Sequence, residues 1–172
     1  MTTKILNTTV RNVKMKVKIG PYKKYRWYHR FFNFSSEPTV SVRIDPWDTW
    51  SMDCTLASII LPMLKQLKET THGAPWVDNE DVPEHLRRAE TPLEYAEDDN
   101  WHSRWDWVLD EMIWTFEQKC RDDWMDDYYG PLIPDERLGK FEWVDHKGLE
   151  EHQRRMTNGF RLFGKYYEGL WD

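Results

Sequence analysis

The chain has 172 residues, the size of one ordinary domain, and only 40% of them are apolar. Eleven Trp, eight Tyr and seven Phe argue against disorder, because each buried ring removes roughly 150–250 Å² from water. The longest apolar run, residues 59–64, is too short to cross a bilayer, and the first residues lack the apolar core of a secretory signal. We therefore exclude membrane and secreted classes and expect a soluble cytosolic protein in which Cys54 and Cys120 are reduced, unpaired and buried.

The net charge of −6 is unevenly distributed along the chain. Residues 1–45 carry ten Lys or Arg and two acidic residues, so this part is basic and the remainder strongly acidic. Such polarity indicates either a face for an anionic partner or two parts of one chain that attract each other.

Two segments near the N-terminus have the period of a half-buried strand. Residues 13–19 alternate apolar residues with Lys, and residues 39–44 alternate again with Val40, Val42 and Ile44 on one side. We expect these strands to pair antiparallel. The aromatic and basic residues 22–34 between them are either a third strand or a short helix.

Three amphipathic helices are predicted further along the chain, over 49–71, 100–121 and 146–170. Each shows apolar residues at helical spacing on one face. Pro62 should kink the first helix, and Asp145 is a suitable N-cap for the third. The connections 74–99 and 122–145 are long, rich in proline and acidic, and they contain aromatic residues that can cover the core.

These elements predict an α+β fold in which a small N-terminal antiparallel sheet packs on a three-helix core with long acidic loops. We expect a single domain over 1–172, made of a basic, β-rich part (1–45) and a helical part (46–172).

A polar stripe on the helix over 100–121 is the sharpest candidate for chemistry. His102, Asp106 and Asp110 follow one another at one-turn intervals beside the apolar face, and Asp53 occupies a similar edge of the first helix. We expect no cofactor, but imidazole and carboxylate groups so placed could bind a divalent metal. The alternative is a solvated acidic edge that pairs with basic residues of the third helix: Arg154, Arg155, Arg161 and Lys165.

Trp107 and Trp114 lie on the same helix but away from its core stripe. A helix with Trp on its second face must bury that face too, under a loop, the N-terminal sheet or another chain. Cover from within the chain is the favoured interpretation; a partner surface is the other.

The segment 22–32 interleaves basic and aromatic residues, a mixture that proteins use to bind single-stranded nucleic acid. Tyr25, Arg26, Trp27 and Arg30 are the candidate contacts. The alternative is that the rings belong to the core and the bases either cover its outer face or dock on the acidic middle of the chain.

Other acidic runs carry less information. Residues 78–84 resemble a calcium loop only superficially, because the EF-hand glycine and the full ligand spacing are missing. Asp122, Asp123, Asp126 and Asp127 are interpreted as solvated charge. The common nucleotide-binding and hydrolase motifs are missing, which disfavours those classes without excluding an enzyme.

Five strings resemble a family of uncharacterised proteins from tailed bacteriophages, many of them marine. They are Asp48-Thr-Trp-Ser-Met-Asp53, Ile60-Leu-Pro-Met-Leu-Lys-Gln-Leu-Lys-Glu-Thr70, His72-Gly-Ala-Pro75, Trp105-Asp-Trp-Val-Leu-Asp-Glu-Met-Ile113 and Phe160-Arg-Leu-Phe-Gly-Lys-Tyr-Tyr167. The resemblance implies a viral protein that acts in the host bacterial cytoplasm or belongs to the virion. The family has no assigned activity, so no functional residue is carried over. Its members often have His at the position of Cys54, so this chain lacks a potential ligand there.

We expect a non-enzymatic interaction protein that binds a host or phage protein, with no membrane partner. A single-stranded nucleic-acid binder, a metal-dependent enzyme using His102, Asp106 and Asp110, and a minor virion component are the alternatives. The oligomeric state is left open.

Overall fold

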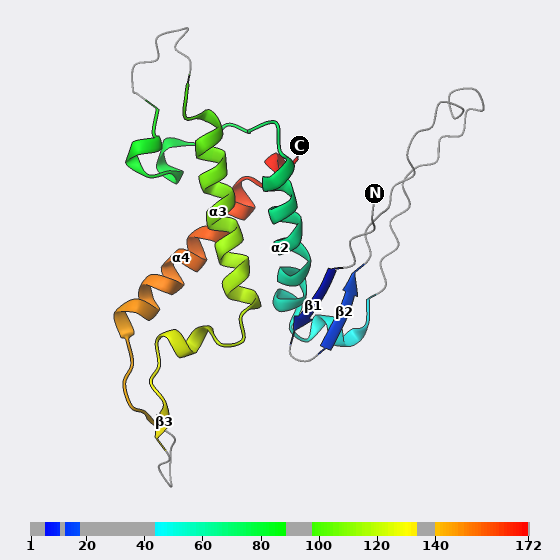
Figure 1. Ribbon diagram of the computed structural model, residues 1–172, viewed down its shortest axis with the longest axis vertical. Helices are drawn as coiled ribbons and strands as arrows, with labels where there is room; N and C mark the ends of the chain where they lie inside the picture. Colours follow the sequence, from blue (N-terminus) through cyan, green and yellow to red (C-terminus); the bar gives the residue numbers. More distant parts are fainter. Residues whose placement is uncertain (1–5, 11–12, 18–43, 89–97, 134–139, 172) are drawn as a thin grey trace, which may run out of the picture. The chain divides into compact units, whose positions relative to one another are not determined.

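A computed structural model of the chain describes residues 6–10, 13–17, 44–88, 98–133 and 140–171 (Figure 1). The chain divides into two compact units, Met1–Thr55 and Leu56–Asp172. This boundary falls later than the predicted change from a β-rich to a helical part at residue 45. That the two units make one domain stays a prediction, and each unit is described by itself.

The first unit contains a short antiparallel ladder. Strand β1 (Leu6–Val10) pairs with β2 (Val13–Val17), with Leu6 opposite Val17. The alternation over 13–19 therefore predicted a strand, but its partner is β1. Most of the expected partner, residues 39–43, lies outside the described part of the chain.

A 3-10 turn, η1 (Pro46–Thr49), precedes the first helix. The Asp45 carboxylate accepts a bond of 2.9 Å from the Trp47 N–H, and the Asp48 carboxylate accepts one of 2.8 Å from the Asp45 N–H. These reciprocal bonds satisfy donors that a helix start leaves unpaired, so they define where the turn begins.

Three helices follow the expected pattern: α2 (Met52–Thr70), α3 (Trp101–Cys120) and α4 (His146–Lys165). Helix α2 continues through Pro62. The predicted N-cap of α4 is confirmed, because the Asp145 carboxylate accepts a bond of 2.9 Å from the Gly148 N–H. Each helix ends within five residues of its predicted terminus, and α4 gives way to a 3-10 turn, η5 (Tyr167–Gly169). No helix among the described residues is long and apolar enough to cross a membrane.

Helix α3 lies between the other two helices (Figure 1). On one side Lys65 and Lys68 of α2 pair with Glu117 and Asp110 of α3. On the other side Arg155 of α4 binds Glu111 of α3, with N–O distances of 2.7 and 3.0 Å. The central position of α3 explains why eight of its residues are buried.

The core of the described residues comes from the helices and from the loop after α2. Its members are Ala57, Leu64, Val77, Val82, Trp105, Val108, Leu109, Met112, Ile113, Phe116, Leu162 and Tyr166. Helices α3 and α4 cross closely at Gly159, where an added Cβ would overlap the Thr115 hydroxyl. Thr115 is fully buried at this crossing.

The predicted α+β class is wrong, and the chain is mainly helical. Among the described residues the strands form two separate two-stranded ladders. Alternating residues predicted strand β2 correctly, but a strand pattern by itself does not show that a sheet joins the core.

Segments with little regular structure connect the helices. Between α2 and α3 lie two 3-10 turns, η2 (Asn79–Asp81) and η3 (Glu84–Leu86). Between α3 and α4 lie η4 (Trp124–Asp127) and a hairpin in which β3 (Leu132–Ile133) pairs with β4 (Lys140–Phe141). The acidic loops thus contain short ordered turns.

Candidate functional site

A cluster of charges joins turn η2 to the C-terminal end of α4. The carboxylate of Asp81 is 4% exposed and accepts three bonds of 2.6 Å: from the Arg161 guanidinium, the Lys165 ammonium and the Tyr166 hydroxyl. The Tyr166 hydroxyl also accepts a bond of 3.0 Å from the Asp78 N–H. A buried carboxylate needs such partners, because an unpaired charge away from water is very costly.

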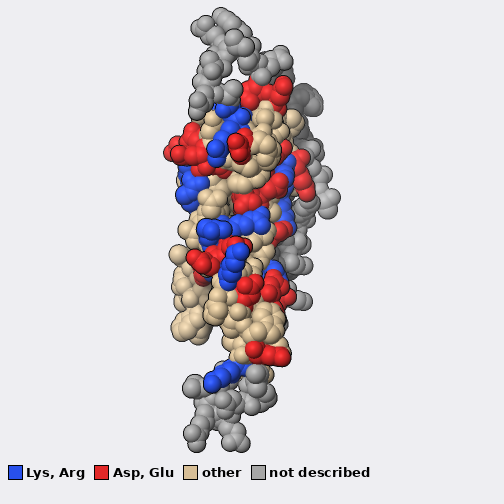
Figure 2. Space-filling view, turned by 90° about the vertical axis from the view of Figure 1, so that its left-hand side faces the viewer, with Lys and Arg blue, Asp and Glu red and all other residues tan. Residues whose placement is uncertain are grey.

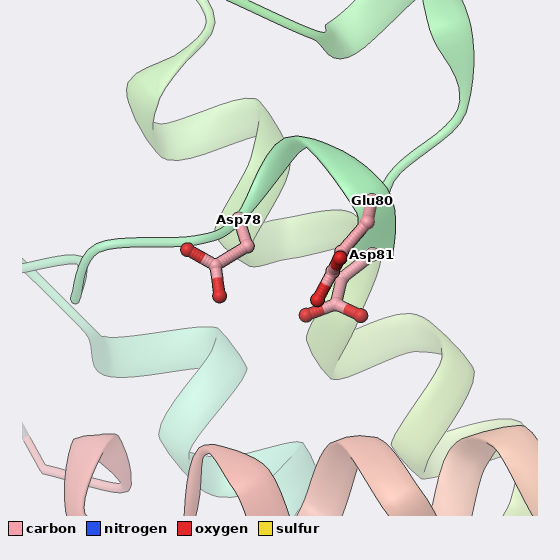
Figure 3. A group of neighbouring side chains, drawn as sticks. All are labelled: Asp78, Glu80 and Asp81. Carbon is pink, nitrogen blue, oxygen red and sulfur yellow. The ribbon is translucent and has the colours of Figure 1, made fainter.

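Figure 3 shows three neighbouring carboxylates of this loop: Asp78, Glu80 and Asp81. All three pair with the same cation. The Lys165 ammonium lies 2.8 Å from Asp78, 3.1 Å from Glu80 and 2.6 Å from Asp81. We call these residues, with Arg161 and Tyr166, the charged clamp. It bonds a loop to a helix about eighty positions later in the chain.

The same three carboxylates have the spacing of a metal-binding group. One oxygen from each of Asp78, Glu80 and Asp81 lies within 4.8 Å of the others, and oxygen ligands suit a hard cation such as Ca²⁺. Lys165 pairs with all three and Arg161 pairs with Asp81, so two cations of the chain itself offset two of the three negative charges.

The pKa values of the clamp describe its protonation state. Burial alone would raise the pKa of Asp81, but the bonds from Lys165, Tyr166 and Arg161 outweigh burial and hold that pKa below its usual value. The Asp78 and Asp81 carboxylates raise the pKa of Lys165. Burial, together with the bond to Asp81, raises the pKa of Tyr166 to about 12. All three shifts move the pKa values further from neutral pH. They therefore favour a structural role for the charged clamp over acid–base catalysis.

A second cluster surrounds His152 on α4. The imidazole is buried, lies parallel to the Trp124 ring with centroids 5.1 Å apart, and has Nδ1 3.0 Å from the Tyr128 hydroxyl. Trp114 completes the contact from α3, 5.3 Å away. Burial lowers the pKa of His152. This aromatic corner joins α3, η4 and α4.

The hairpin between α3 and α4 exposes large apolar side chains. Leu132, Phe141 and Trp143 are 60, 46 and 50% exposed, and we call them the hairpin surface. Leu132 lies opposite Phe141 in the ladder, so both side chains point to the same face. Phe141 also contacts Tyr129, with ring centroids 4.6 Å apart.

Trp143 lies directly over Gly130. A Cβ at Gly130 would come within 2.7 Å of the indole, and the Gly130 N–H donates a bond of 2.9 Å to the Trp143 carbonyl. The glycine therefore lets the ring lie close to the backbone at Gly130, and Trp143 stays 50% exposed.

Comparison with known proteins adds no relative. No family model, curated protein or solved structure matches this chain. The geometry above is therefore the basis for any functional interpretation.

The structure does not gather the metal residues predicted on α3. His102 and Asp106 are exposed, and Asp110 binds Lys68 of α2. Within the described residues, the carboxylates that converge are those of Asp78, Glu80 and Asp81. A metal at His102, Asp106 and Asp110 stays a prediction.

The two off-face tryptophans of α3 have cover from within the chain. Trp114 contacts His152, and the Arg155 guanidinium lies 3.9 Å from the centroid of its ring. Trp107 is half-buried and packs against the core. Their role in binding a partner stays a prediction. Tyr25, Arg26, Trp27 and Arg30 lie outside the described residues.

The charged clamp was not predicted from the sequence. One alternative was that Arg161 and Lys165 pair with the acidic edge of α3, but their partners belong to turn η2 and Asp78. One signal was available: Arg161 and Lys165 are one turn apart on a helix, so they share a face that needs acidic partners.

Proposed function

We propose that this chain is a non-enzymatic interaction protein whose hairpin surface binds another protein. The observation that carries the proposal is the hairpin surface itself: Leu132, Phe141 and Trp143, each about half exposed. Aromatic side chains are enriched where protein partners meet. Following the resemblance to phage proteins, the partner belongs to the bacterial host or to the phage.

The energy available from this surface is appreciable. Covering the exposed half of one aromatic ring removes roughly 75–125 Å², which is worth about 2–3 kcal/mol before the cost of ordering the interface. Two rings and Leu132 can thus serve as the central residues of a small interface. The ladder fixes their spacing, so less entropy is lost on binding than in a free loop.

Affinity capture with matched variants tests the proposal. Tagged wild-type chain, Phe141→Ser and Trp143→Ser are each incubated with lysate of the infected host, and captured proteins are quantified by mass spectrometry. We expect at least one protein whose recovery falls about tenfold or more with either substitution, the loss that about 1.4 kcal/mol of binding energy produces.

Tyr167→Ser is the control. It removes an exposed ring of similar size from turn η5, away from the hairpin sequence, and its capture should equal that of the wild type. Captured proteins that are unaffected by the hairpin substitutions, or reduced equally by the control, would contradict a specific role for the hairpin surface.

A further inference from the structure

A shallow groove of about 860 Å³ runs along the outer face of α4. Trp124, Tyr129 and Leu149 supply half-buried apolar side chains at one end. His146, Glu150, Gln153, Arg154, Thr157, Asn158 and Arg161 line the rest. From His146 to Arg161 the helix rises about 22 Å, enough for another helix to lie alongside.

Two opposite charges in this groove have no partner in the described part of the chain. Glu150 and Arg154 stand one turn apart, yet neither side chain forms a hydrogen bond or ion pair with another described residue. Arg154 differs in this from every other described arginine, since Arg87, Arg88, Arg104, Arg121, Arg155 and Arg161 all bond within the chain.

The charge on this side of the molecule is mixed in sign. Figure 2 views the side on which α4 lies in Figure 1, and basic and acidic residues alternate over it without a continuous patch of one sign. A mixed surface fits a partner of equally mixed charge better than a polyanion.

We propose that the groove binds a second copy of this chain, with the two α4 helices antiparallel across a two-fold axis. Such an interface brings the same surface from both copies together, so residue i of one copy faces residue j of the other and the reverse. With the axis level with residue 152, Glu150 of each copy faces Arg154 of the other. The dimer then contains two ion pairs, each between Glu150 of one copy and Arg154 of the other.

The same arrangement brings an apolar side chain of the groove close to the other copy. In this register Leu149 of one copy lies level with residue 155 of the other, about 3 Å along the helix axis from Thr157. Thr157 is short enough to permit close approach. The inference does not rest on the proposed role of the hairpin surface.

Charge reversal tests the proposal on the full chain. Molecular mass is measured by sedimentation over a range of concentrations. The wild type should approach twice the 21.0 kDa of one chain. Glu150→Arg places Arg against Arg154 of the other copy, and Arg154→Glu places Glu against Glu150. Each single reversal should raise the dissociation constant of the dimer tenfold or more, because like charges then meet.

The double reversal E150R/R154E should restore the wild-type dissociation constant, because its pairs are again opposite in charge. Glu151→Lys is the control: Glu151 pairs with Lys147 on the same helix, outside the groove, and its reversal should leave the mass unchanged. A monomer at every concentration, a dimer indifferent to the single reversals, or a double variant that stays monomeric would overturn the proposal.

Discussion

At Asp81 a buried carboxylate meets two cations and a hydroxyl, and the balance among these groups decides how firmly turn η2 is held. Replacing Asp81 by Asn keeps its size but removes the charge that Lys165 and Arg161 face. We expect a loss of about 2–3 kcal/mol in the free energy of unfolding, measured by urea denaturation. Glu80→Gln is the matched control, because Glu80 binds the same Lys165 from an exposed position; it should change stability by less than about 0.5 kcal/mol.

The loss of stability at low pH, the acid limb of the stability–pH curve, should also depend on Asp81. The pKa of Asp81 is held below 3.8, its usual value, so the unfolded chain takes up this proton at a higher pH than the folded chain. The stabilisation is therefore complete above pH 3.8 and is lost as the pH falls through the folded pKa. Asp81→Asn should flatten that part of the stability–pH curve; an unchanged acid limb would show that other carboxylates control it.

His152 should affect stability at a milder pH. Burial lowers its pKa below 6.5, so the folded chain resists a proton that the unfolded chain accepts. Stability is complete above pH 6.5 and falls as the pH drops below it, by at most about 1.4 kcal/mol per pH unit, until the folded pKa is passed. Urea denaturation between about pH 5 and 7.5 measures this slope. His152→Phe should abolish it, and His146→Phe, at an exposed position, should retain it.

At the scale of the helices, α3 and α4 can cross closely because Gly159 has no side chain. Gly159→Ala adds a methyl group where the Thr115 hydroxyl and the Glu111 carbonyl already lie. We expect a loss of about 1–3 kcal/mol, measured by thermal unfolding, although alanine favours helices by almost 1 kcal/mol. Gly164→Ala on the same helix meets no atom within 4 Å and should stabilise the fold slightly. Equal effects at both positions would mean that the helices are not closely packed.

The helices were predictable and the strand pairing was not, for a physical reason. Helices are local: the apolar spacing of Trp105, Val108, Leu109 and Met112 defines a buried face without reference to any other segment. A strand needs a partner, and alternation over residues 13–17 is equally compatible with several. The nearer segment, β1, is the partner in the structure. The predicted α+β class was wrong because the chain is mainly helical.

The basic face of the charged clamp could be predicted, but its acidic partners could not, because they lie far away in the sequence. Asp81 and Tyr166 are 85 positions apart, and no local pattern shows that they meet. An acidic loop and a basic helix end are each compatible with plain solvation. The aromatic corner was predicted in part. Trp114 predicted a second buried face of α3, but the sequence did not show that His152 covers it.

On the scale of the whole molecule, every described core residue lies between Ala57 and Tyr166. A fragment of residues 45–172, which keeps the cap before η1, should therefore retain cooperative unfolding. Urea denaturation followed by circular dichroism and by tryptophan fluorescence would give coincident transitions if it does. Transitions that separate, or a fragment without a sharp transition, would show that the first 44 residues contribute to the core.

The position of Lys165 affects how strongly the loop of Asp78, Glu80 and Asp81 depends on free cations. Loops rich in carboxylates are often ordered only while the surroundings supply calcium, so they report its concentration. In this loop the cation that pairs with all three carboxylates is Lys165, a residue of the chain itself. Because Lys165 and Arg161 offset two of the three negative charges, this loop should depend less on free cations than a loop of unpaired carboxylates would.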